Sequence, residues 1–303
     1  MNNWFGLIPS ALLMVAPILI TACGGMICER SGVVNIALEG LMGIGAFAAA
    51  AFHAINEFAL GGASVWLALL VGAVCGAIMS LILAYAAVSL NADQTIAGTG
   101  INLLVNGITI FMAQILFNQD RTKEFNMGMR TIGNTGIYPT AIIALCVVLI
   151  CWFVLYKLPV GLRLRACGEH PQAAASVGIN VKKVRYAAVI VSGFLGGLAG
   201  ACLVLTYTIQ YTSNTINGAG FIALAAVSFG RWRPAGISLS SLLFGTAVAF
   251  SVYVTNIASL RELLPTEFFT MLPYIITLAA LVVFSGKNYA PAASGKPYEK
   301  GAS

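Results

Sequence analysis

The sequence predicts an all-α polytopic membrane protein, and its composition and charge distribution support this fold class. Hydrophobic residues make up 59% of the 303 positions and charged residues only 9%, whereas soluble domains carry roughly 25% charged residues. The charges are clustered, so that segments such as 6–28 and 63–90 contain none. Both segments exceed the ~20 residues that cross a bilayer as a helix. A soluble fold of this size could not cover its surface with so few polar groups.

Hydropathy predicts the spans in order along one domain, 1–303. The first half contains five, at about 6–27, 36–55, 63–90, 96–117 and 139–156. The second half contains three, at about 186–207, 235–257 and 270–285, and a shorter glycine-rich segment near 217–229. We therefore expect about 8–10 transmembrane helices, some of them discontinuous.

Basic residues predict the orientation of these spans. The segment 157–185 contains six of the sixteen Lys and Arg residues, namely Lys157, Arg163, Arg165, Lys182, Lys183 and Arg185. Cytoplasmic loops are enriched in Lys and Arg, so this segment is predicted to be cytoplasmic. Residues 229–234 and the tail 286–303 would then lie inside, and the N-terminus and 118–138 outside. No basic stripe with interleaved aromatic residues is present in the sequence, which argues against a nucleic acid partner.

A weak internal repeat relates the two halves. The helix 6–27 is followed by a broken stretch at 29–45, and the helix 186–207 by another at 214–220, an offset of about 180 residues. After five crossings the second unit would be inverted. Paired, glycine-interrupted segments in inverted halves indicate a transport pathway near the bilayer midplane. The alternative is two unrelated glycine-rich packing helices.

The first broken stretch contains polar and charged residues, which are unusual in a chain this apolar and need an explanation. Glu29 and Arg30 end a helix and are expected to remain at the membrane interface. Glu39 lies inside the next apolar run, where a carboxylate must face water, the bundle interior or a partner. Asn35 and Glu39 are four residues apart, on one face of a predicted helix, and together could bind a polar cargo. Alternatively, Glu39 pairs with a neighbouring helix or with backbone N–H groups.

A second polar stripe lies within the predicted span 96–117. Asn102, Asn106 and Thr109 recur at helical spacing on one face. Such a stripe either hydrogen-bonds one helix to another or lines a water-filled path. We favour the path, because so many amide and hydroxyl groups share one region.

The basic segment contains a short helix. Pro171 is suited to a first helical position and Gly178 to the end of a helix, which predicts a helix over 171–177. Its small side chains would allow another protein to dock closely. His170 has neither a nucleophile nor a second histidine beside it in the sequence, so catalysis is not expected.

Motifs for catalysis and metal binding are missing from the sequence. It contains no phosphate-binding GxxxxGK[ST] loop, no HExxH and no GxSxG. The seven cysteines do not form CxxC pairs or zinc-ligand spacings, and are interpreted as small core residues. We therefore expect no enzyme activity, cofactor or metal on this chain.

Several motifs in order resemble a known family. These are ERSGVVNIALEG, DQTIAGTGINLL, RACGEHPQAAASVGIN, GAGFIALAAVSFGRWRPAG, MLPYIITL and APAASGKPYEKG. They resemble the permease subunits of bacterial ABC-type importers for branched-chain amino acids, simple sugars and nucleosides. The resemblance covers about residues 10–301 and is greatest to the shorter permease chain of the nucleoside branch.

The resemblance implies a large type II-like importer permease fold in the bacterial cytoplasmic (inner) membrane. It also implies a second permease chain in a heterodimer, a cytoplasmic ATP-binding subunit that holds ATP and Mg²⁺, and a periplasmic or lipid-anchored substrate-binding protein. The residues that would then form the coupling helix are Gly168, Glu169, Pro171, Ala174 and Gly178. The expected cargo is a nucleoside, and purine nucleosides are the preferred candidates.

Other functions remain open at this stage. Within the family, simple sugars or branched-chain amino acids are alternative cargoes, although an amino acid needs recognition of two charges and this bundle offers few. An ion-coupled secondary transporter could use Glu39 as its proton or sodium site. A structural scaffold would leave the polar stripes inside apolar helices unexplained.

Overall fold

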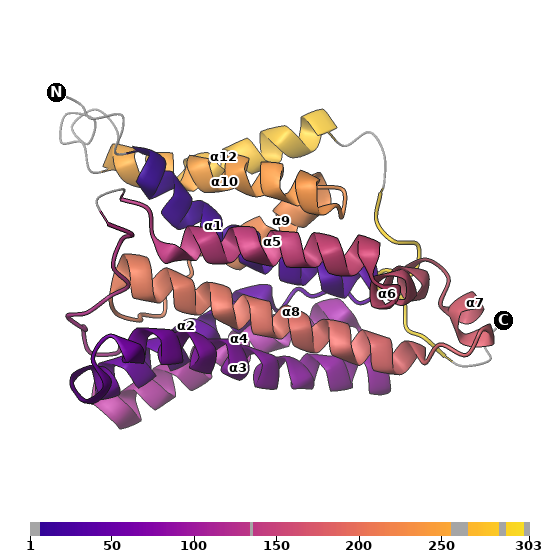
Figure 1. Cartoon of the computed structure of the whole chain (residues 1–303), viewed down its shortest axis with the longest axis horizontal. Helices are drawn as coiled ribbons and strands as arrows, with labels where there is room; N and C mark the ends of the chain where they lie inside the picture. Colours follow the sequence, from indigo (N-terminus) through magenta and orange to yellow (C-terminus); the bar gives the residue numbers. More distant parts are fainter. Residues whose placement is uncertain (1–6, 134–135, 256–265, 285–288, 300–303) are drawn as a thin grey trace.

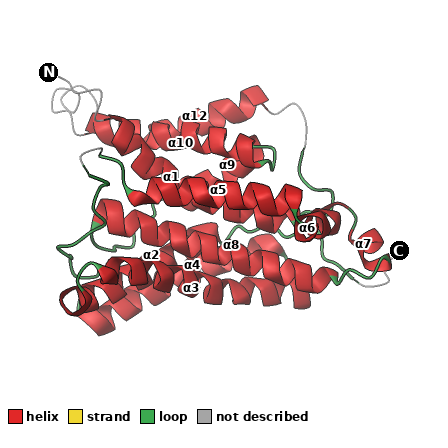
Figure 2. Cartoon of the chain, viewed as in Figure 1, coloured by secondary structure: helices red, strands yellow, loops and turns green. Residues whose placement is uncertain are grey.

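The structure is a computed structural model that describes residues 7–133, 136–255, 266–284 and 289–299. The part of the chain that it describes is helical and contains no strand (Figure 2). Its helices are α1 (Leu7–Arg30), α2 (Leu38–Leu60), α3 (Ala63–Ala84), α4 (Gln94–Phe117), α5 (Pro139–Lys157), α6 (Pro159–Glu169), α7 (Pro171–Ser176), α8 (Val181–Leu203), α9 (Ala219–Phe229), α10 (Pro234–Thr255) and α12 (Thr266–Phe284). Short π-helical turns, Tyr85–Ser89 and Val204–Thr208, extend α3 and α8.

The helices confirm the predicted polytopic membrane fold. Among the described residues, seven helices are long and apolar enough to cross a membrane: α1, α2, α3, α4, α5, α8 and α10. The shorter α9 and the apolar α12 correspond to the predicted segments 217–229 and 270–285. Residues 6, 256–257 and 285 of the predicted spans, and 286–288 and 300–303 of the predicted tail, lie outside the described residues.

Helix starts follow local chemistry. Asp93 precedes α4, and its side chain accepts hydrogen bonds from the backbone N–H groups of Thr95 and Ile96, at 2.8 and 3.0 Å. This satisfies donors that a helix leaves unpaired at its N-terminus. Pro139 and Pro159 stand in the first turns of α5 and α6, where the absence of a backbone N–H costs nothing.

The helices run along the long axis of the molecule, with α1 and α8 at the centre of the bundle (Figure 1). Helix α8 packs against α1, α2 and α3, and α1 packs against α5, α8, α9 and α10. The first helix of each predicted unit thus packs on the third helix of the other unit, α1 on α10 and α8 on α3. This reciprocal exchange is what an internal repeat relating α1–α3 to α8–α10 would produce.

Glycines bring α2, α3 and α8 into close contact. A Cβ atom on Gly45 of α2 would overlap the backbone of Gly197 in α8. One on Gly76 of α3 would overlap the backbone of Gly193 and lie 2.7 Å from the Cα atom of Gly197. Small residues at helix interfaces let backbones approach and increase dispersion contacts, which favour helix association in a bilayer.

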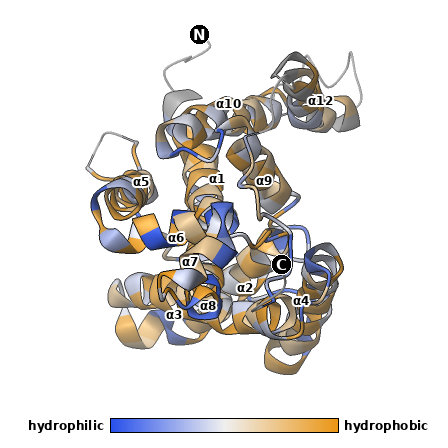
Figure 3. Cartoon of the chain, turned by 90° about the vertical axis from the view of Figure 1, so that its right-hand side faces the viewer, coloured by the Kyte–Doolittle hydropathy of each residue, from blue (hydrophilic) through white to orange (hydrophobic). Residues whose placement is uncertain are grey.

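Polar segments gather at the two ends of the bundle. At one end, α6, α7 and the segment 289–299 lie beside the end of α1 (Figure 1), and hydrophilic residues mark this end in Figure 3. At the other end, residues 118–133 pair with the chain after α8, where Thr122 N donates to Tyr211 O at 3.1 Å and Met129 N to Leu205 O at 2.8 Å. The segments predicted to be cytoplasmic therefore share one end; its facing toward the cytoplasm stays a prediction.

Candidate functional site

The site lies where the two broken stretches meet. The first stretch is not helical at 33–35, and α2 begins only at Leu38. The second precedes α9, where Asn217 and Gly218 both adopt positive φ, at 45° and 82°. This left-handed turn starts α9 with Gly218 at its N-cap, a residue that has no side chain to satisfy the free N–H groups.

Glu39 satisfies those N–H groups from the other half of the molecule. Its Oε1 accepts a hydrogen bond from Gly218 N and its Oε2 one from Gly220 N, both at 2.7 Å. A carboxylate is favourable here because the N-terminus of a helix carries partial positive charge. Gly220 permits the approach, since a Cβ atom at this position would lie 2.5 Å from the Glu39 backbone. The alternative in which Glu39 pairs with backbone N–H groups is therefore confirmed.

Side chains of α4 form hydrogen bonds with the backbone of the first broken stretch. The side chain of Asn102 uses both of its polar atoms: Oδ1 accepts from Gly40 N at 2.8 Å, and Nδ2 donates to Ile36 O at 3.0 Å. Near the start of α4, Gln94 Oε1 accepts from Val34 N at 2.7 Å. These bonds replace backbone bonds that the chain loses where it is not helical. Asn102 thus orders the break as well as lining the space beside it.

Thr109 connects α4 to the second broken stretch. Its hydroxyl accepts a hydrogen bond from the Tyr211 hydroxyl at 3.0 Å and donates to Asn106 O at 3.1 Å. Tyr211 is buried and its ring packs edge-on against Phe47 of α2. Sequence patterns did not single out Tyr211, because an isolated tyrosine in an irregular segment has no periodicity to mark it.

A cavity of about 200 Å³ lies at this junction. Its lining is polar, with neutral amide and hydroxyl groups and one carboxylate, contributed by α2, α4 and the stretch before α9. The lining residues are Glu39, Gly40, Gly43, Asn102, Asn106, Tyr211, Ser213, Asn214, Ile216 and Asn217. Of the residues predicted to line a pathway, Glu39, Asn102 and Asn106 meet here, whereas Thr109 stands behind Tyr211.

Asn35 occupies a different place from the predicted one. It precedes α2, so it does not share a helical face with Glu39, and that part of the prediction is wrong. The reason is the nonhelical backbone at 33–35. Asn35 is fully buried, its Nδ2 donates to Ser192 Oγ of α8 at 2.8 Å, and its Oδ1 has no partner among the described residues. A role for Asn35 in a pathway stays a prediction.

A second candidate site is the end of the bundle formed by α6 and α7. Gly168 and Glu169 end α6, and α7 covers Pro171–Ser176, one residue shorter than predicted. Ala174 is buried, while Gly178 has φ +84° and no atom of the described residues within 4 Å of a Cβ placed there. Gly168 touches α1 so closely that its Cβ would overlap the Arg30 carbonyl. The segment therefore presents a small, open surface and is anchored on α1.

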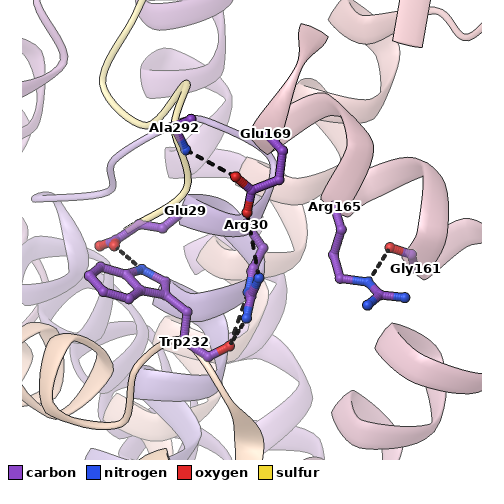
Figure 4. Close-up of polar contacts among 7 residues, drawn as sticks. All are labelled: Glu29, Arg30, Gly161, Arg165, Glu169, Trp232 and Ala292. Carbon is purple, nitrogen blue, oxygen red and sulfur yellow. Dashed lines mark hydrogen bonds and ion pairs between the residues drawn. The ribbon is translucent and has the colours of Figure 1, made fainter. Parts of the chain in front are cut away.

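Sequence reasoning missed the polar cluster under this segment, shown in Figure 4. Glu29 is buried and accepts a hydrogen bond from Trp232 Nε1. Arg30 donates to the Trp232 carbonyl through Nε and Nη2, at 3.0 and 2.8 Å, and its Nη1 lies 3.9 Å from Glu169 Oε1. Glu29 and Arg30 lie at the end of α1 as expected, and the turn between α9 and α10 bonds to both of them; their position relative to the membrane surface stays a prediction. The motif FGRWRP was the available signal.

The long apolar helices and their broken, polar junction define a multi-pass membrane protein. A family model described as the branched-chain amino acid transport system permease component matches residues 7–281. The chain belongs to this family.

Similar proteins extend over the same length. A guanosine ABC transporter permease of Bacillus subtilis is 42% identical, with 97% of each chain covered. A nucleoside ABC transporter permease of Lactococcus lactis is 38% identical, with 97% of this chain and 96% of the relative covered. A second guanosine ABC transporter permease of the same Bacillus is 23% identical and covers 99% of this chain and 88% of its own length.

Proposed function

We propose that this chain is a permease subunit of an ATP-driven importer of nucleosides, purine nucleosides first, in the bacterial cytoplasmic membrane. The observation that carries the proposal is the polar cavity at the junction of the two broken stretches. Full-length similarity to permeases named for guanosine and for nucleosides supports the cargo.

The cavity chemistry favours a neutral polar cargo. Asn106, Asn214 and Asn217 offer amides that both donate and accept, and Ser213 and Tyr211 offer hydroxyl groups. A side-chain amide can make a paired hydrogen bond to the edge of a purine, as Asn does with adenine. Among the described residues that line the cavity, the single charged group is the Glu39 carboxylate, whose charge would repel a cargo carboxylate. A nucleoside therefore fits better than an amino acid, and its base distinguishes it from a simple sugar.

The hydrogen bonds that Glu39 makes argue against an ion-coupled secondary transporter in which Glu39 is the proton or sodium site. Both carboxylate oxygens accept backbone N–H groups at the start of α9, a structural use that leaves the free donors of the helix satisfied. A proton or sodium site on Glu39 would compete with these bonds.

The proposed importer also needs three partner subunits. The chain would pair with a second permease, and the presence of two guanosine permeases of different sequence in one Bacillus supports a heterodimer. A cytoplasmic ATP-binding subunit, holding ATP and Mg²⁺, would dock on 157–185, with Gly168, Glu169, Pro171, Ala174 and Gly178 forming the coupling segment. A periplasmic or lipid-anchored binding protein would deliver cargo to the opposite end.

Uptake of radiolabelled guanosine tests the proposal, in cells with and without this chain and with excess uridine, ribose or leucine as competitors. We expect saturable uptake that is lost without the chain, is lost on ATP depletion, and is competed by nucleosides alone. Competition by ribose or leucine would contradict the cargo. Uptake that survives ATP depletion but stops when ion gradients collapse would contradict the ATP-driven mechanism.

A further inference from the structure

The C-terminal segment, residues 289–299 of the described part, lies across the end of the bundle between α1 and α6. Its backbone bonds to both neighbours. Ala293 N donates to Gly168 O at 2.9 Å, and Gly295 N donates to Gly32 O at 3.2 Å. In Figure 1 this yellow segment passes beside α6 and ends near α7. The segment therefore bridges the end of α6 and the turn that follows α1.

Tyr298 anchors the end of the segment. It is 7% exposed and packs in an apolar cluster with Cys167, Ala174 and Val181, one residue each from α6, α7 and α8. The next residue continues the contact, because Gln172 Nε2 donates to Glu299 O at 3.0 Å. Burying an aromatic side chain removes a large apolar area from water. Tyr298 thus closes the core that supports α7.

The C-terminal segment also provides the contacts of a buried cation, the guanidinium group of Arg185. Its side chain is 1% exposed, and Nη1 donates to Lys296 O at 2.9 Å. The guanidinium carbon lies 6.0 Å from the centre of the Tyr298 ring, within reach of a cation–π interaction. Among the described residues, Nε and Nη2 have no hydrogen-bond partner. The compensation that the structure gives this buried cation comes from the C-terminal segment, so losing that segment would expose an unpaired charge.

Glu169 connects the segment to the cluster beneath α6. Its Oε2 lies 3.3 Å from the donor Ala292 N, and its Oε1 lies 3.9 Å from Arg30 Nη1. Figure 4 shows these contacts in succession, from Ala292 to Glu169, from Glu169 to Arg30 and from Arg30 to the Trp232 carbonyl. Displacing the C-terminal segment would therefore loosen α6 on its attachment to α1.

We propose that the segment 289–299 is a strap that fixes α6 and α7 as one rigid docking surface, with Tyr298 and Arg185 as its positioning residues. The proposal rests on the docking role of α6–α7 proposed above. A rigid surface would pass the movement of a docked ATPase directly to α1 and α8, the central helices that flank the broken stretches. Without the strap, α7 would move while α1 and α8 stayed in place.

Hydrogen exchange of the purified full-length permease, with the wild type and the variants compared in the absence of the ATP-binding subunit, tests the strap independently of transport and of docking. In Tyr298→Ala, peptides covering 164–179 should exchange at least about tenfold faster, because the cluster beneath α7 is opened. Tyr298→Phe keeps the ring and should exchange like the wild type. Lys296→Ala should also match the wild type, since only the Lys296 carbonyl is used. Peptides from α10 serve as the folding control, and Tyr298→Leu is the milder variant if Tyr298→Ala fails there.

Recovery of the co-expressed ATP-binding subunit, measured beside Gly178→Arg, is the second readout. We expect Tyr298→Ala to retain less than about a tenth of the wild-type ATPase and Tyr298→Phe to retain it fully. Unchanged exchange at 164–179 would overturn the strap. Faster exchange with full ATPase recovery, where Gly178→Arg loses its ATPase, would overturn the positioning role. If Gly178→Arg also keeps its ATPase, the docking surface itself is wrong, and exchange alone then decides the strap.

Discussion

Glu39 and Gly218 are separated by 179 positions, yet Glu39 Oε1 accepts a 2.7 Å hydrogen bond from Gly218 N. The carboxylate of the first broken stretch thereby replaces the side-chain cap that α9 lacks. The two breaks form one junction, and each completes the hydrogen bonding of the other. The polar cavity lies beside this junction and is lined by residues of both stretches.

Replacing Glu39 by Gln should impair transport and loosen the junction. Glutamine has one carbonyl oxygen and one NH₂ group, so it can accept from Gly218 or Gly220 but must face the other N–H with a donor. We expect a loss of about 1.5–3 kcal/mol of stability, the range for a hydrogen bond to a charged group. Guanosine uptake should fall about tenfold or more, measured at matched membrane expression. Asn106→Ala, which shares the cavity but caps no helix, is the control for stability. Normal uptake and thermal stability in Glu39→Gln would contradict this role.

The helix contact at Gly197 should tolerate no added carbon. A Cβ atom there would lie 2.9 Å from Gly76 Cα and would overlap the Gly72 carbonyl. Overpacking of this kind costs about 1–3 kcal/mol. We therefore expect Gly197→Ala to lower the thermal unfolding temperature in detergent, measured by tryptophan fluorescence.

The matched control for Gly197 is Gly107→Ala in α4. In the part of the chain that the structure describes, no atom lies within 4 Å of a Cβ at Gly107, and alanine is the better helix former by about 1 kcal/mol. Gly107→Ala should therefore leave stability unchanged or raise it. Equal destabilisation by the two substitutions would show that the glycine contact between α3 and α8 has no special importance.

Removing the indole N–H of Trp232 should destabilise the buried end of α1. Trp232→Phe takes away the donor to Glu29 and leaves a buried carboxylate without that bond, at a cost of about 1–3 kcal/mol. Glu29→Gln is the comparison, because an amide oxygen can still accept from the indole. We expect Trp232→Phe to lower thermal stability more than Glu29→Gln does. The reverse order would indicate that the charge of Glu29, rather than its bond to Trp232, matters at this position.

Two substitutions at Gly178 distinguish the effect of backbone strain from an effect on docking. Its φ of +84° is unfavourable for any residue with a Cβ, but a Cβ there would meet no atom of the described residues within 4 Å. Gly178→Ala and Gly178→Arg carry the same backbone penalty of about 1–2 kcal/mol, and only arginine adds bulk to the surface. We expect ATPase co-purification to be lost with arginine and retained with alanine. Equal recovery with the two variants would contradict docking at this surface.

Much of the fold follows from local signals in the sequence. Apolar length predicts the spans, and the shorter glycine-rich segment near 217–229 corresponds to the short helix α9. The basic segment predicts α7 because Pro171 and Gly178 mark its ends. These features depend on composition and on nearby residues, so one sequence is sufficient to predict them.

The site depends on contacts between distant parts of the chain, which local patterns do not encode. The capping of α9 by Glu39 and the hydrogen bond that Trp232 donates to Glu29 join residues about 180 and 200 positions apart. Asn35 was misplaced because helical spacing was assumed where the backbone is not helical. Tyr298 and Arg185 came together through a tail that composition alone marks only as polar.

The most direct test of the account is the accessibility of a cysteine placed at Asn214. This residue is exposed in the cavity beside Glu39. In Asn214→Cys, a membrane-impermeant thiol reagent should block guanosine uptake, and excess nucleoside should slow the modification. Arg130→Cys at the same end of the bundle and the wild type, with its seven native cysteines, should be insensitive. Modification of Asn214→Cys that neither blocks uptake nor responds to nucleoside would contradict a pathway through the junction of the two broken stretches.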